Sequence, residues 1–98
     1  MPKPKLHKQD LINISVLLQQ YYDCVNCDSL FIKKMFKHTL YDLKMRLYRK
    51  LTTVSPNGCT FKLKEVEKNA ILYMRNELQI FGSGESEKSI YKLLEINQ

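Results

Sequence analysis

Residues 29–51 constrain the fold most, because their apolar side chains recur at helical spacing over a long stretch. At about 100° per residue, the apolar residues fall on one face and the cations project from the other. The apolar face comprises Ile32, Phe36, Leu40, Leu43 and Leu47, and the opposite face carries Lys34, Lys37, His38, Lys44 and Arg49. Asp42 is the only acid on that outer face. The stretch therefore predicts a long helix that buries one side and presents a basic side.

A chain of 98 residues is long enough for one hydrophobic core and too short for two independent domains. The formal net charge is +6, and it is unevenly placed. Residues 1–64 hold 12 Lys/Arg against 4 Asp/Glu, a net of +8, whereas residues 65–98 hold 4 against 6, a net of −2. Such asymmetry fits contact with nucleic acid, an anionic membrane or an acidic protein, and it also fits simple solubility.

A first helix is predicted to begin with Asp10 as its N-cap and to bury Leu11, Ile14, Leu18, Tyr21 and Val25. No Lys or Arg occurs between Gln9 and Ile32, and the opposite side of this helix is also partly apolar. We therefore expect this helix to be covered on more than one side, by the long helix and by a second copy of the chain. The predicted oligomer interface comprises Ile12, Val16, Leu17 and Tyr21.

The remaining sequence predicts a turn and two further helices. Residues 52–63 combine β-branched residues, the turn signal Ser-Pro-Asn-Gly and an alternating run, which predicts a small β-hairpin or an extended loop. A third helix is expected over residues 64–81, with Val66 and Phe81 on its inner side, and a short fourth helix follows Gly84. The predicted fold is thus a mainly α, single-domain arrangement of four helices over residues 10–98, preceded by a mobile basic arm at residues 1–9.

Cys24 and Cys27 have the two-residue spacing found in redox and zinc sites. A redox site would need a helix that starts at the first cysteine, whereas this pair follows a predicted helix. Zinc would need four ligands, and the remaining candidates, Cys59, His38 and His7, fit no standard spacing. We therefore expect reduced thiols and no cofactor, with Cys24 and Cys27 as the residues at which a metal would be sought.

No nucleophile with a matching histidine and acid is recognisable, so we expect no enzymatic activity. The segment Gly82-Ser83-Gly84 precedes a helix as phosphate-binding loops do, but Glu85 and Glu87 would repel a phosphate there. The apolar run at residues 11–18 is far shorter than the ~20 residues that span a bilayer. A non-membrane, cytoplasmic protein is expected, given three cysteines and no secretory signal.

The basic face of the long helix is the main functional signal. Its cations could contact phosphates, and its tyrosines could stack on an exposed base. The predicted binding surface comprises Lys34, Lys37, His38, Tyr41, Lys44, Met45, Tyr48 and Arg49, flanked by Arg46 and Lys50. The partner would be nucleic acid or an acidic protein. In the alternative, Tyr41, Met45 and Tyr48 pack against a second chain or a partner protein, and the lysines stay in water with their stems over the rings.

The segment Thr-Phe-Lys-Leu-Lys-Glu-Val-Glu at residues 60–67, with Ala-Ile-Leu at 70–72 and the helix over residues 40–51 before it, resembles small uncharacterised proteins of Bacteroides-like bacteria and their mobile elements. The pattern covers about half the chain and contains no catalytic motif. The resemblance implies a helical fold and a bacterial or phage setting. One hypothesis is therefore a binding protein for nucleic acid or an acidic surface; the other is a homo-oligomeric interaction or inhibitor module.

Overall fold

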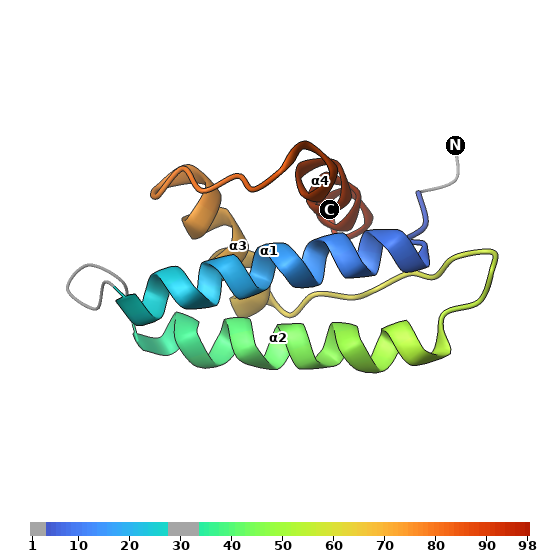
Figure 1. Cartoon of the computed structure of the whole chain (residues 1–98), viewed down its shortest axis with the longest axis horizontal. Coiled ribbons are helices and arrows are strands. Elements are labelled where there is room, and N and C mark those ends of the chain that lie inside the picture. Colours follow the sequence, from blue (N-terminus) through green and yellow to red (C-terminus); the bar gives the residue numbers. More distant parts are fainter. Residues whose placement is uncertain (1–3, 28–33) are drawn as a thin grey trace.

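The computed structural model describes residues 4–27 and 34–98, which contain four helices (Figure 1). The helices are α1 (Lys8–Cys27), α2 (Lys34–Thr53), α3 (Glu65–Asn76) and α4 (Gly84–Ile96). This arrangement confirms the predicted mainly α, four-helix domain. The predicted start of the long helix, at residues 29–33, lies outside the described residues, as do the side chains of Cys27 and Lys34.

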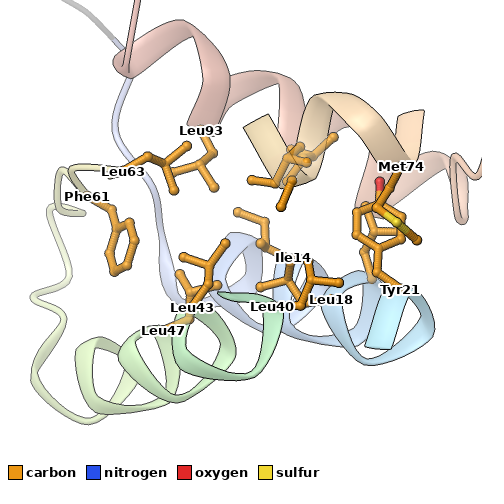
Figure 2. Close-up of a cluster of buried hydrophobic side chains, with 14 of the residues drawn as sticks. Ile14, Leu18, Tyr21, Leu40, Leu43, Leu47, Phe61, Leu63, Met74 and Leu93 are labelled. Atoms are coloured by element: carbon orange, nitrogen blue, oxygen red, sulfur yellow. The ribbon is translucent and has the colours of Figure 1, made fainter. Parts of the chain in front are cut away.

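Helices α1 and α2 run antiparallel and form the central pair of the fold (Figure 1). The apolar faces predicted from helical periodicity meet in the core (Figure 2). The core residues of α1 are Leu11, Ile14, Leu17, Leu18, Tyr21 and Val25, and those of α2 are Phe36, Leu40, Leu43 and Leu47. Helix α3 packs on α2 and α4 packs on α1, so the second half of the chain covers the pair from one side.

The segment between α2 and α3 adopts the extended-loop alternative, and the described residues form no β-hairpin there. It returns along the α1 and α2 pair after the turn at residues 55–58 (Figure 1). Cys59 pairs with Leu6 instead of with a neighbouring strand, through two backbone hydrogen bonds of 2.8 Å each. Because an isolated hairpin is marginal in water, pairing with a buried residue of another segment is the more stable solution.

The described part of the predicted N-terminal arm packs against the rest of the chain. Leu6 is fully buried in the core, and α1 begins at Lys8, two residues before the predicted N-cap. Asp10 lies in the first turn of α1, where its carboxylate accepts the backbone N–H of His7 at 3.0 Å. Residues 1–3 lie outside the described part of the chain.

The side chain of Asn97 fixes the extended segment to the end of α4. Its carbonyl oxygen accepts the backbone N–H of Leu63 at 2.7 Å, and its amide nitrogen donates to the carbonyls of Phe61 and Leu93, each at 2.8 Å. One amide side chain thereby replaces a strand partner for residues 61–63, whose buried backbone groups need hydrogen bonds. Phe61 and Leu63 are thus held with their side chains in the core.

Helix α3 is shorter than predicted, because it ends at Asn76 and a loop takes residues 77–83. Gln79 and Gly82 both have positive φ, 56° and 76°, which a continuing helix does not allow. Phe81, predicted to face inward, therefore lies in the loop and is 46% exposed. Val66, also predicted to face inward, is 44% exposed although it lies within α3. A Cβ at Gly82 would lie 2.6 Å from the side chain of Leu17, so the loop approaches α1 closely and needs glycine there.

Asp10 also ties the start of α1 to α4. Its carboxylate accepts the hydroxyl of Ser89 at 2.9 Å and the ammonium of Lys92 at 3.1 Å. Burial alone would raise the pKa of Asp10, but the hydrogen bonds from His7, Ser89 and Lys92 outweigh it and hold that pKa below the ordinary value of 3.8. The carboxylate is therefore more stable ionised in the folded chain than in the unfolded chain.

This lowered pKa predicts a loss of stability in acid. A group whose pKa is depressed on folding stabilises the fold above its unfolded pKa, and that contribution disappears as the pH falls through the folded pKa. The Asp10→Asn variant should therefore be less stable at neutral pH and should lose less stability than the wild type below pH 3.8. Urea unfolding from pH 7 to pH 2 measures both effects. Asp23→Asn, at an exposed position of α1, is the control, and identical pH profiles for the wild type and Asp10→Asn would contradict the argument.

Candidate nucleic-acid interface

The structure divides the predicted basic surface of α2 into three strips. Helical periodicity places Lys37, Tyr41, Lys44 and Tyr48 within about 60° of one another, on one side of α2. This side lies next to α1, because the ammonium of Lys44 donates to Gln19 and the ring centroids of Tyr41 and Tyr22 lie 6.1 Å apart. We call this strip the α1 seam.

The outermost strip of α2 carries His38, Met45 and Arg49. His38 and Arg49 are exposed, and Met45 is half-buried. The side chain of Lys34, which was predicted to belong to the same surface, lies outside the described part of the structure. These residues share the solvent face that the sequence predicted, but the described contacts do not gather them around one hollow.

A third strip faces the extended segment and forms a groove with it. The groove has a volume of about 410 Å³ and is lined by Arg46, Arg49, Lys50, Thr53, Thr60, Phe61 and Lys62. Its lining contains four cations and no acid. We call it the basic groove. The prediction included Arg49 at this site and Arg46 and Lys50 as its flanks, but Lys62 and Thr60 were missed, although they alternate with the inward residues Phe61 and Leu63.

Arg46 is a brace of this groove and not a free cation. Its guanidinium forms an ion pair with the buried carboxylate of Glu67 and donates to the carbonyl of Lys62 at 2.9 Å. It also lies over the ring of Phe61, 4.7 Å from the ring centroid. Glu67 accepts in addition the backbone N–H of Lys64 at 2.8 Å, at the start of α3. Arg46 thereby connects α2, the extended segment and α3.

The free charge of the groove comes from Arg49, Lys50 and Lys62. None of the three forms an ion pair with an acid in the described part of the chain. The carboxyl end of α2 carries about half a negative charge, which three full positive charges outweigh. The hydroxyls of Thr52 and Thr53 also donate to the last carbonyls of the helix, at 2.7 Å and 3.2 Å, which reduces that negative charge further.

Two of the four residues predicted for the oligomer interface have no exposed side chain in the folded chain. Leu17 and Tyr21 are fully buried within the chain, because the loop at Gly82 covers Leu17 and Met74 of α3 lies beside Tyr21 (Figure 2). Val16 is 51% exposed and Ile12 is half-buried. At Leu17 and Tyr21, the apolar character of α1 is therefore explained by burial against the second half of the same chain.

A second polar cluster lies buried beside Tyr21. The guanidinium of Arg75 forms an ion pair with Glu87 at 2.7 Å and lies over the ring of Tyr91, 4.4 Å from its centroid. Burial would lower the pKa of Arg75, but the hydrogen bond and charge of Glu87 raise it, so the guanidinium stays charged. Burial also raises the pKa of Tyr21 to about 12, opposed by the charge of Arg75 and reinforced by that of Glu87. The cluster therefore contains a structural ion pair between α3 and α4.

The cysteines show no arrangement for redox or metal chemistry in the described residues. Cys24 and Cys59 are free thiols. Burial raises the pKa of Cys59, and the nearby charge of Lys50 opposes this only in part, so its thiol is not activated. Among the side chains that the structure describes, no three of His, Cys, Asp or Glu lie close enough together to hold a metal ion. The side chain of Cys27 lies outside that set.

Across the residues that the structure describes, no helix combines the length and apolar character needed to cross a membrane. Searches of protein-family models, curated proteins and solved structures found no match to this chain.

Proposed function

We propose that this protein is a non-enzymatic binding protein for nucleic acid and that the outer surface of α2 is its contact surface. The observation that carries the proposal is the surplus of unpaired cations on α2. Lys37, Lys44, Arg49 and Lys50 form no ion pair with a carboxylate in the described part of the chain, and Asp42 is the only acid of the helix. Unpaired Lys and Arg gain free energy at phosphates by releasing condensed counterions.

The test is fluorescence anisotropy of a labelled mixed-sequence duplex and a labelled single strand across a salt series. We expect a Kd of ~1 µM or tighter at ~50 mM salt, with log K falling by about 0.9 per phosphate contact on the duplex and about 0.7 on the single strand. Absence of binding at ~50 mM salt, where phosphate contacts are strongest, would overturn the proposal. The basic surface would then be assigned to an acidic protein partner.

Self-association is the second candidate, and the exposed apolar groups on the α1 seam favour it. Tyr41 is 48% exposed, Tyr48 is 42% exposed, and Val16 of the adjacent helix is 51% exposed. A dimer formed through such groups would survive high salt, whereas phosphate binding would not. Sedimentation at ~50 mM and ~500 mM salt, with Tyr41→Ala/Tyr48→Ala as the comparison, separates the two candidates. The cytoplasmic and bacterial or phage settings stay expectations from the sequence.

A further inference from the structure

The basic groove brings together cations from two parts of the chain that are distant in sequence. Arg49 and Lys50 come from the last turns of α2, and Lys62 comes from the extended segment that returns beside that helix. Thr60 adds an exposed hydroxyl on the same side. The lining includes no Asp or Glu, and among the described residues only Glu67 forms an ion pair with a lining residue, Arg46. The groove therefore concentrates positive charge that its own acids do not cancel.

The groove is also held in a fixed shape before any ligand binds. Arg46 anchors the backbone of Lys62 by a hydrogen bond of 2.9 Å, and Asn97 holds the backbone of Phe61 and Leu63 on either side. The pairing of Cys59 with Leu6 fixes the segment just before these residues. Cations on a preorganised frame lose less conformational entropy on binding than cations on a mobile loop. The geometry thus favours this groove over a flexible segment as an anion site.

The α1 seam is less suited to the same role. The ammonium of Lys44 is already engaged by Gln19 and lies 5.5 Å from the ring centroid of Tyr48. A phosphate would have to displace that contact or share the donor, and only Lys37 would remain as an unengaged cation on the seam. The two surfaces therefore differ in how many cations are free to reach a ligand.

We infer that the basic groove is the phosphate-contact site of the proposed nucleic-acid-binding function, with Arg49, Lys50 and Lys62 contacting the sugar-phosphate backbone. The inference rests on that proposed function. The aromatic ring in the lining, Phe61, is only 6% exposed and is covered by Arg46, so it offers no face on which a base could stack. Contacts of this kind position a nucleic acid without reading its bases. The groove should therefore bind the backbone with little sequence preference.

The experiment compares two variants that each remove two positive charges from α2 or its groove. The groove variant is Lys50→Gln/Lys62→Gln, and the matched control is the seam variant Lys37→Gln/Lys44→Gln. Circular dichroism first checks that both fold like the wild type. Binding of a labelled mixed-sequence duplex and of labelled oligo(dT) is then followed by anisotropy from ~50 mM to ~300 mM salt, with two duplexes of different sequence to test base preference.

The groove variant should bind at least about tenfold more weakly at ~50 mM salt, and its salt slope on the duplex should fall by about 1.8, or 0.9 for each lost contact. The seam variant should lose less affinity than the groove variant, and its salt slope should fall by less. Equal losses in the two variants, a larger loss in the seam variant, or strong preference for one duplex would overturn the groove assignment while leaving nucleic-acid binding intact. A wild-type protein that binds neither probe would overturn the proposed function itself, and with it this inference.

Discussion

Replacing Glu87 by alanine is expected to lower the free energy of unfolding by about 3 kcal/mol, because it leaves a buried guanidinium without its counter-charge. The side chain of Arg75 is only 7% exposed, and its hydrogen bond to Glu87 is 2.7 Å long. The rings of Tyr91 and Phe81 lie at 4.4 Å and 5.8 Å from it and cannot replace a carboxylate. Glu87 itself is 23% exposed, which places the expected cost at the low end of the range for buried pairs.

Urea unfolding at pH 7 measures this cost, and the chain supplies a matched control. Glu85 lies in the same first turn of α4, and it is 76% exposed and pairs with Lys88 at 3.9 Å. Glu85→Ala removes the same charge and should cost less than about 1 kcal/mol, as exposed pairs do. If the two substitutions cost the same, the buried pair does not stabilise α4 in the way described. The double variant Arg75→Met/Glu87→Met should recover most of the loss, since it removes both charges together.

The sequence predicted the two central helices well because their stabilisation follows from local periodicity. The apolar stripe of α2 recurs every three or four residues, and any helix with that stripe must bury it. Leu40, Leu43 and Leu47 are all fully buried as expected. The same periodicity could not say what covers a helix. Leu17 and Tyr21 were assigned to a second copy of the chain, whereas the loop at Gly82 and helix α3 cover them.

The extended segment was less predictable because side chains far away in the sequence determine it. Its alternating pattern is compatible with a strand or a loop, and the choice depends on available hydrogen-bond partners. Asn97 supplies them from the C-terminus and Arg46 from α2. Neither hydrogen-bonding role can be predicted from the local sequence, because an asparagine near a helix end and an arginine among other cations are common in proteins. The predicted end of α3 was also wrong, because Gln79 adopts a positive φ that nothing in a non-glycine residue signals from the sequence.

For the candidate site, the sequence predicted where positive charge is concentrated along the chain but not which cations lie together in space. Counting Lys and Arg along the chain located the excess of positive charge in residues 1–64, but the count treated Arg46 as one more free cation. The structure assigns that guanidinium to Glu67 and the carbonyl of Lys62. It also brings Lys62 next to Arg49 and Lys50, 12 or more residues earlier in the chain, which no helical pattern can predict. The arrangement of the unpaired cations could therefore be determined only from the tertiary structure.

Glu67→Ala tests whether the geometry that Arg46 gives the basic groove matters. This substitution should lower the free energy of unfolding by about 2 kcal/mol. Glu67 is only 2% exposed and accepts the N–H of Lys64 at 2.8 Å as well as the guanidinium of Arg46. Its removal leaves one helix-end donor and one partly buried cation without their acceptor. Because the side chain of Arg46 is 28% exposed, water can satisfy part of that loss, which keeps the cost below that of Glu87→Ala.

The same substitution separates net charge from geometry in ligand binding. Glu67→Ala makes the protein more positive by one charge, so affinity for a duplex should rise if net charge alone decides it. If the braced groove is the site, release of Arg46 loosens Lys62 and the affinity should fall by several-fold despite the added charge.

Glu65→Ala is the control, because Glu65 is exposed in the same turn of α3 and its loss adds the same charge. It should cost less than about 1 kcal/mol and raise the affinity slightly. Equal rises in affinity for both variants would show that the brace is not needed for binding, whereas a fall in Glu67→Ala alone would tie binding to the geometry that Arg46 maintains.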